Sequence, residues 1–161
     1  MSLTKFIRPI LSTRLHKLDA YTSKAEILQR NVLRQLLSKS YSTEWGSAHG
    51  YAKDLSYENF ARQTPLNTYE ELKGFIDRMR HGEKDVLWPG RVKWYAKSSG
   101  TTNDKSKFIP VSTDALHDTH YAGGKDAVVW YLRNNPKSKI FDGKALILGG
   151  SHAPNYNLSD S

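Results

Sequence analysis

Residues 94–112 constrain this chain more than any other stretch, because they set a polar loop between two apolar segments. Residues 94–96 are typical of a strand end, and residues 108–111 resume the apolar pattern. Between them, residues 98–107 are almost entirely small, polar or basic. Backbone N–H groups, hydroxyls and ammonium groups together can hold phosphate oxygens. The sequence therefore predicts a polyphosphate-binding loop between two strands, with a plain surface turn as the alternative.

Two common nucleotide motifs do not fit this loop. A Walker A motif needs a second glycine five residues after the first, and counting from Gly100 places Lys105 there. A dinucleotide fingerprint also fails, because Gly100 has no G-x-x-G continuation and the pair Gly123-Gly124 follows no expected strand. The loop is therefore neither a Walker A loop nor a dinucleotide-binding loop.

The loop resembles the phosphate loop of adenylate-forming enzymes, and among them the Gretchen Hagen family of acyl-acid amido synthetases, which conjugate auxin and jasmonate, with their bacterial relatives. The residues that carry the resemblance are Ser98, Ser99, Gly100, Thr101 and Thr102, then Lys107, then Phe108, Ile109 and Pro110. Acyl-CoA synthetases usually place the lysine one residue earlier, so this spacing favours the amido synthetases. Many members carry glycine where this chain has Asp104.

The resemblance extends over most of the chain and implies a fold. Residues 43–46, 65–72 and 82–90 also look like that family. The implied fold is α/β, the amino-terminal portion of the large domain of an adenylate-forming, acyl-CoA synthetase-like enzyme. Residues 1–161 would form a partial domain: helical over 1–85, a strand-loop-strand unit over 92–111, a helix over 113–134 and a strand over 143–149. The remainder of the large domain and the carboxy-terminal domain would lie outside this chain.

The resemblance also implies a chemistry. ATP, with Mg²⁺, would activate a small-molecule carboxylic acid as an acyl-adenylate, and an amine or amino acid would then displace AMP. Ser98, Ser99, Gly100, Thr101, Thr102 and Lys107 would bind the phosphates of ATP. No residue is assigned as catalytic or as a metal ligand. The alternatives are an acyl-CoA ligase of the same superfamily and a basic nonenzymatic module that binds nucleic acid or a protein partner.

Composition bears on the partners. The net charge of +8 suits a polyanion, but the basic residues are scattered without a run of five, so we expect no nucleic-acid partner. The absence of cysteine excludes disulfides and is compatible with the cytoplasm, where we expect the protein. No apolar run approaches the roughly 20 residues that span a bilayer, so we expect no membrane insertion.

The amino-terminal residues 1–18 are basic and allow two interpretations. One is an organelle transit peptide. The favoured one is an amphipathic helix with five apolar residues turned inward: Phe6, Ile7, Ile10, Leu11 and Leu15.

Capping patterns and apolar periodicity predict the other helices. Capping boxes at Ser23–Glu26 and Thr68–Glu71 predict helices over 24–39 and 69–80, and Ser56 predicts a short helix through Phe60. Residues 40–53 are expected to form a loop pinned by aromatic side chains. In the helix 113–134, the pair Gly123-Gly124 predicts a kink or a close packing contact.

Three histidines are candidate functional groups. His117 and His120 share a helix face without an evident third metal ligand, so we expect solvated or capping histidines. His152 follows the expected strand 143–149, where a side chain can face a cleft.

A partial domain would leave the strand near residues 144–148 without neighbours and the loop without an adenine pocket. The 161-residue chain alone is therefore expected to bind ATP poorly, to be inactive, and to self-associate through the open strand edge. Sedimentation and calorimetry with Mg-ATP measure both properties. A monodisperse monomer with a micromolar Kd for ATP would contradict this expectation.

Overall fold

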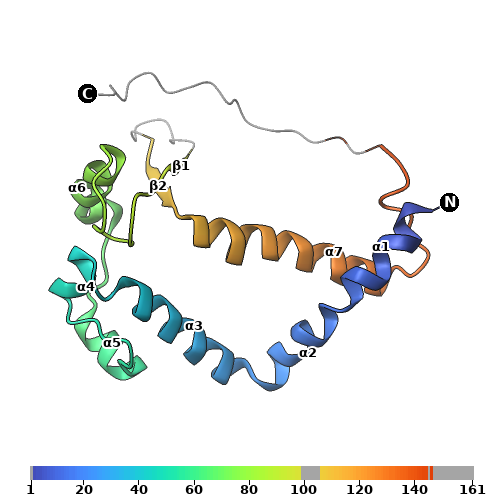
Figure 1. Cartoon of the computed structure of the whole chain (residues 1–161), viewed down its shortest axis with the longest axis horizontal. Coiled ribbons are helices and arrows are strands. Elements are labelled where there is room, and N and C mark those ends of the chain that lie inside the picture. The colour runs from blue at the N-terminus through green and yellow to red at the C-terminus, as the bar shows by residue number, and fades with distance from the viewer. Residues whose placement is uncertain (1, 99–105, 145, 147–161) are drawn as a thin grey trace. The chain divides into compact units, whose positions relative to one another are not determined.

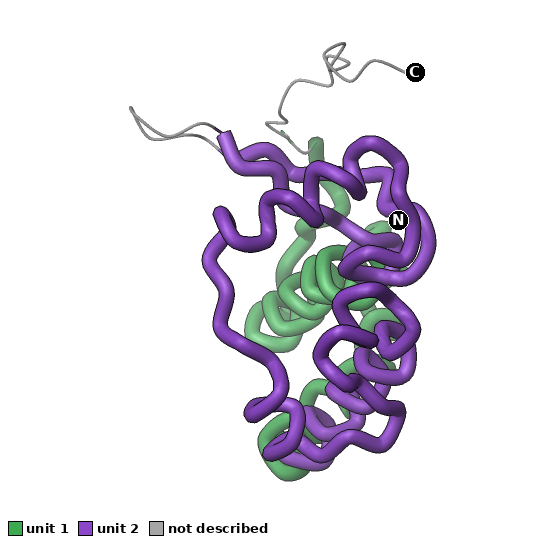
Figure 2. The backbone as a smooth tube through the Cα atoms, turned by 90° about the vertical axis from the view of Figure 1, so that its left-hand side faces the viewer, with its two compact units in different colours: residues 1–25, 117–161 green, residues 26–116 purple. Residues whose placement is uncertain are grey.

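The computed structural model describes residues 2–98, 106–144 and 146. These residues divide into two compact units, which Figure 2 colours separately. Unit 1 comprises Met1–Ala25 with His117–Ser161, and unit 2 comprises Glu26–Leu116. Over the described residues, no helix combines the length and the apolar character needed to cross a bilayer.

Unit 1 contains the helices α1 (Leu3–Ser12), α2 (Leu15–Ser23) and α7 (Ala122–Asn134), labelled in Figure 1. Leu18, Val129 and Leu132 are its buried apolar residues. The Arg14 guanidinium, between α1 and α2, donates to the Asp126 carboxylate of α7 through Nη2 at 3.0 Å. Asp142 accepts the Thr4 N–H at 2.9 Å, and its pKa is lowered, chiefly by the hydrogen bond from the Ser2 hydroxyl.

The amphipathic pattern of residues 1–18 is divided between two helices. Leu11 and Leu15 are half-buried, whereas Phe6 and Ile10 are 64% and 62% exposed. The expectation that all five apolar residues turn inward is wrong for Phe6 and Ile10. Leu18 and Thr4 are the buried residues of this segment.

Unit 2 contains α3 (Ala25–Ser40, apart from its first residue), α4 (Glu44–Ala48), α5 (Tyr57–Gln63), α6 (Tyr69–Arg80), β1 (Trp94–Lys97) and β2 (Phe108–Val111). The bounds of α3 and α6 agree with the predicted helices to within one residue. Ser56 caps α5 by accepting the Asn59 N–H at 3.2 Å, as predicted. Ser23, by contrast, is the last residue of α2, so the predicted capping box before α3 is wrong.

The core of unit 2 lies where α6 meets the segment that leads into β1. Met79, Val86 and Val92 are its buried residues, each at most 5% exposed. Four partly buried side chains pack against them: Phe75, Leu87, Trp88 and Tyr95. Burial of such apolar side chains is the main favourable term that holds these elements together.

A short helix, α4, lies within the loop expected over residues 40–53. Thr43 caps α4, because its hydroxyl accepts the Gly46 N–H at 3.0 Å. The first N–H groups of α4 donate to the segment before β1, Glu44 to the Asp85 carbonyl at 2.8 Å and Trp45 to the Val86 carbonyl at 3.0 Å. The expected aromatic anchoring is present, since the Trp45 ring meets Phe75 edge-on at 5.5 Å between centroids. Partners distant in sequence thus stabilise a helix too short to predict.

The helix expected over 113–134 is irregular in its first half. Ser112 caps it by accepting the Ala115 N–H at 3.1 Å, and the π-helix η1 (Ala115–Tyr121) leads into α7. A Cβ at Gly123 or Gly124 would meet no described atom within 4 Å, so the close packing contact expected there is wrong. The irregular segment, the π-helix η1, ends just before the glycine pair rather than at it.

The described sheet has two strands, which run side by side in Figure 1. They pair antiparallel, with Trp94 opposite Val111 and Lys97 opposite Phe108. The described residues are thus helix-rich with a small antiparallel sheet, and no parallel α/β sheet is found among them. Of the strand expected over 143–149, Gly143 and Lys144 are not in a strand, and residues 145 and 147–149 lie outside the described residues.

The close approach of α4 to the end of α3 yields a stability prediction. A Cβ at Gly46 would lie 2.0 Å from the Ser40 carbonyl oxygen, so Gly46→Ala should lower the free energy of unfolding by about 2 kcal/mol or more. Gly74 is the matched control, because it lies in α6 with open space around its Cβ position. Gly74→Ala should stabilise the protein by about 0.5–1 kcal/mol through helix propensity. Urea denaturation followed by circular dichroism measures both, and equal effects of the two variants would contradict the packing argument.

Candidate functional site

The hairpin β1–β2 brings together the two ends of the loop predicted to bind phosphate. Ser98 follows β1 and Lys107 precedes β2, and they form a reciprocal pair. The Ser98 N–H donates to the Lys107 carbonyl at 2.9 Å, and the Lys107 N–H donates to the Ser98 hydroxyl oxygen at 3.1 Å. The loop is therefore closed at its base. Ser99, Gly100, Thr101 and Thr102 lie outside the described residues.

The hairpin is attached to the core of unit 2 through β1. Tyr95 packs against the cluster of Met79, Val86 and Val92, and its hydroxyl donates to the Val92 carbonyl at 3.4 Å. Burial raises the pKa of Tyr95, with Arg80 and Arg91 acting in the opposite direction. Tyr95 is thus a neutral structural support at physiological pH.

Helix α6 contacts the other side of the hairpin, where the loop re-enters β2. The Tyr69 hydroxyl accepts the Phe108 N–H at 3.0 Å, and the Lys107 ammonium lies 5.4 Å from the centroid of the Tyr69 ring. At the other end of α6, the Arg80 guanidinium lies 3.8 Å from the centroid of the Phe108 ring. Arg80 is also paired with Asp77 at 3.0 Å. Two side chains of one helix therefore fix Phe108.

A capping box determines where Tyr69 lies. Thr68 is the N-cap of α6, and its hydroxyl oxygen accepts the Glu71 N–H at 3.4 Å. The Glu71 carboxylate accepts the Thr68 N–H at 2.6 Å, and this backbone hydrogen bond is the largest cause that lowers the pKa of Glu71. The predicted capping box is confirmed. Sequence reasoning placed Tyr69 on the apolar face of the helix and missed its contacts with the loop.

Two of the three candidate histidines, His117 and His120, lie among the described residues, beside an aromatic ring. His117 and His120 both contact the Tyr121 ring, with centroid separations of 5.6 and 5.4 Å. Within the part of the chain that the structure describes, no group of three or more His, Cys, Asp or Glu side chains is placed to hold a metal ion. His152 lies outside the described residues.

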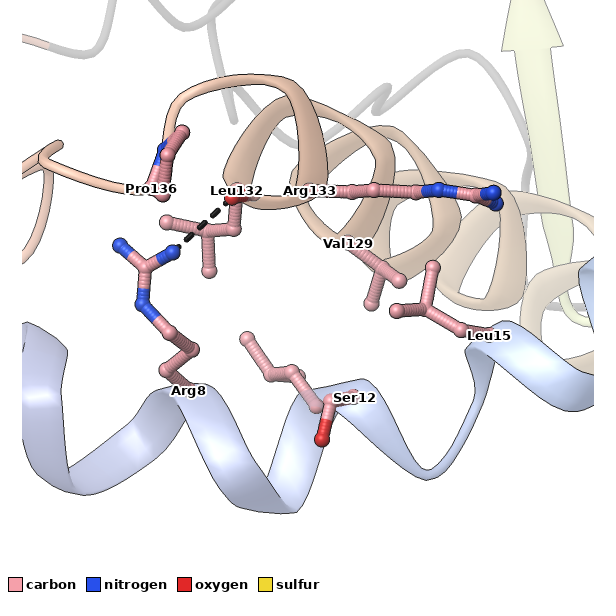
Figure 3. Close-up of a pocket in the computed structure, with 8 residues that line it drawn as sticks. Arg8, Ser12, Leu15, Val129, Leu132, Arg133 and Pro136 are labelled. Carbon is pink, nitrogen blue, oxygen red and sulfur yellow. Dashed lines mark hydrogen bonds between the residues drawn. The ribbon is translucent and has the colours of Figure 1, made fainter.

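Unit 1 contains a small pocket of about 150 Å³ (Figure 3), lined by Arg8, Leu11, Ser12, Leu15, Val129, Leu132, Arg133 and Pro136. Its two cations are already engaged. Arg8 donates to the Leu132 carbonyl at 2.9 Å, drawn as a dashed line in Figure 3, and Arg133 pairs with Asp19 at 2.6 Å. The pocket therefore offers an apolar lining without an uncommitted charged group, and we assign it no ligand.

The capping box yields a prediction about the loop. Thr68→Ala should lower the free energy of unfolding by about 1 kcal/mol at pH 7 and should speed hydrogen exchange of the Phe108 amide, because the start of α6 loosens. Ser56→Ala removes the matching cap of α5 and should leave the Phe108 amide unchanged. Chemical denaturation and amide exchange followed by NMR measure these effects.

The same box should respond to acid. The pKa of Glu71 is lowered from its ordinary 4.5 in the folded state, so its stabilising contribution is complete above that value. It is lost as pH falls through the lowered pKa. The difference in stability between the wild type and Glu71→Ala, which lacks the titrating carboxylate, should shrink over that range. A difference independent of pH would contradict the capping box as the cause.

Comparison with known proteins agrees with the family resemblance of the sequence. The sequence pattern of the GH3 family N-terminal domain matches residues 14–157. The indole-3-acetic acid-amido synthetase GH3.6 of Arabidopsis thaliana is 30% identical over 104 residues, covering 64% of this chain and 17% of that protein. The jasmonoyl-L-amino acid synthetase JAR4 of Nicotiana attenuata is 28% identical over 137 residues, covering 82% of this chain and 22% of that protein.

The match to these relatives spans about a fifth of their length, between 17% and 22%. The family pattern, in contrast, covers most of this chain, including α2 to α7 and the whole hairpin. The chain therefore belongs to the GH3 family.

Proposed function

We propose that this chain supplies the ATP phosphate-binding loop of an acyl-acid amido synthetase, as the amino-terminal portion of the large domain of an adenylate-forming enzyme. The observation that carries the proposal is the closed base of the loop. The reciprocal hydrogen bonds of Ser98 and Lys107 set a hydroxyl and a lysine side by side at the loop's two ends, within a chain of the GH3 family.

The proposed reaction has two steps. An oxygen of the substrate carboxylate attacks the α-phosphorus of ATP, and the bond to the oxygen that bridges to the β-phosphate breaks, giving an acyl-adenylate and pyrophosphate. An amine then attacks the acyl carbon, the bond to AMP breaks, and the nitrogen loses a proton to form the amide. The substrates are a small-molecule carboxylic acid and an amine or amino acid, the class that the names of the relatives indicate for those proteins.

The role proposed for the loop is electrostatic. Lys107 would place its positive charge on the β- and γ-phosphates, and the Ser98 hydroxyl with residues 99–102 would donate hydrogen bonds to their oxygens. Charge develops on pyrophosphate as it leaves, so donors fixed in advance lower the barrier without reorganising. The closed base at Ser98 and Lys107 favours such pre-organisation.

The side chains at the base of the loop suit phosphate oxygens rather than a cation. Lys107 and Ser98 offer donors, and the described residues include no acidic cluster of the kind that holds a metal ion. Mg²⁺, when bound with ATP, would neutralise part of the phosphate charge, and we assign it no protein ligand among the described residues.

The proposal predicts the effect of removing the lysine. In an amido synthetase of the relatives' length that contains this chain, Lys107→Ala should lower carboxylate-dependent ATP–pyrophosphate exchange by at least roughly tenfold. A charge-assisted contact to phosphate is worth about 1.5–3 kcal/mol, which corresponds to that loss. Lys105→Ala should have a smaller effect.

Lys93→Ala is the matched control, because Lys93 is an exposed lysine before β1 rather than in the loop. Exchange that is unchanged in Lys107→Ala would remove the loop from the mechanism. An equal loss of exchange in Lys105→Ala would show that the assignment of the phosphate contact to Lys107 is wrong. Assays with thiol and amine acceptors separate this activity from that of an acyl-CoA ligase.

A further inference from the structure

A single side chain, Tyr69, contacts both the backbone and the charge at the exit of the loop. Its hydroxyl accepts the Phe108 N–H at 3.0 Å, and its ring lies 5.4 Å from the Lys107 ammonium. Lys107 and Phe108 are consecutive, so the two contacts act on the same point of the chain. Tyr69 is half-buried, and the capping box of Thr68 and Glu71 fixes its place as the first residue of α6.

The contact with the ring restricts a side chain that is otherwise free to move. Lysine has many rotamers, so its side chain loses conformational entropy when a ligand immobilises the ammonium group. An aromatic face attracts an ammonium and keeps it near one position. That attraction is weaker than a charge-assisted hydrogen bond to a phosphate. The ring therefore orients the lysine without preventing it from reaching a phosphate.

The opposite end of α6 completes the support. The Arg80 guanidinium lies 3.8 Å from the centroid of the Phe108 ring and is paired with Asp77. Arg80 therefore contacts the side chain of Phe108, and Tyr69 contacts its backbone N–H. Tyr69 and Arg80 are the first and last residues of α6. The same helix contributes Met79 to the core beneath β1. The exit of the loop is thus supported by a helix that is itself anchored.

We infer that Tyr69 is a positioning residue for Lys107: it holds the lysine at the exit of the loop in an orientation ready to bind the phosphates of ATP. The inference rests on the proposed function of the loop. Tyr69 itself need not touch the nucleotide, since its ring acts through the ammonium and its hydroxyl through the Phe108 amide.

A double-mutant cycle in the same amido synthetase tests the inference, with kcat/KM for ATP in pyrophosphate exchange as the measurement. Tyr69→Leu should lower kcat/KM about threefold to tenfold, because both contacts are lost. Tyr69→Phe keeps the ring and should recover most of this loss. In the Lys107→Ala background, Tyr69→Leu should change kcat/KM by less than about twofold, since the group on which the ring acts is gone.

Tyr57→Leu is the matched control. Tyr57 occupies the same position in α5 as Tyr69 does in α6, directly after a capping residue, and it belongs to a different helix. It should leave kcat/KM for ATP unchanged. Circular dichroism of each variant establishes that the comparison is made between folded proteins.

The outcomes separate the inference from the proposed function. An unchanged rate in Lys107→Ala would overturn the proposed function, and the inference with it. A loss in Lys107→Ala together with fully additive effects of Tyr69→Leu, or with no effect of Tyr69→Leu alone, would overturn the inference and leave the function standing. Failure of Tyr69→Phe to recover activity would show that the ring does not orient the lysine.

The 161-residue chain provides a readout that does not depend on activity. Tyr69→Phe removes the acceptor of the Phe108 N–H, so hydrogen exchange of that amide should become faster in NMR spectra. The Ser98 amide donates to the Lys107 carbonyl and serves as the internal reference. Unchanged exchange at Phe108 would overturn the hydroxyl contact.

Discussion

The burial of Met79, Val86 and Val92 is the interaction on which the rest of unit 2 depends. These three residues come from α6, from the turn after it and from the segment that leads into β1. The turn is tight, with Asp85 at φ 59° and Gly90 at φ 73°, and the Gly90 N–H donates to the Asp85 carboxylate at 2.7 Å. The cluster therefore sets the start of the hairpin directly beside the helix that holds the loop's exit.

Charged pairs around this core contribute less to the free energy of unfolding than their number suggests. Arg78 joins Glu44 of α4 to Glu83, donating to Glu44 through Nη1 at 3.0 Å and to Glu83 through Nε at 2.8 Å. Hydrogen bonds to Glu83 and then to Glu44 raise the pKa of Arg78, and Arg78 lowers the pKa of both carboxyls. All three side chains are more than 40% exposed, so water screens the attraction. Their role is to orient α4 against α6 rather than to stabilise the fold strongly.

The candidate site is attached to unit 2 through the two described ends of its polar loop. Its base is closed by Ser98 and Lys107, and its exit is held through Phe108 by Tyr69 and Arg80. The Nε atom of Arg80 is buried without a hydrogen-bond partner among the described residues. Such an unsatisfied donor costs free energy, which the contacts of its guanidinium with Phe108 and Asp77 offset.

The sequence by itself determined the features that depend on neighbours in the chain. The capping box at Thr68 and Glu71, the extent of α6, the cap at Ser56 and the two segments that flank the loop follow from local hydrogen bonds and apolar spacing. The family followed from the loop motif. Each of these signals is complete within a few residues, so no distant partner is needed to recognise it.

Only the tertiary structure decided the features that depend on distant partners. The helix α4 is stabilised by the carbonyls of Asp85 and Val86, and Gly46 is required by the Ser40 carbonyl. The exposure of Phe6 and Ile10 likewise could not be predicted from the helical pattern. Such a pattern identifies the apolar face of a helix but not which residues pack against that face. The contact of Tyr69 with Lys107 joins residues 38 positions apart, and no sequence pattern links the two residues. Such contacts arise only when packing has brought the two segments together.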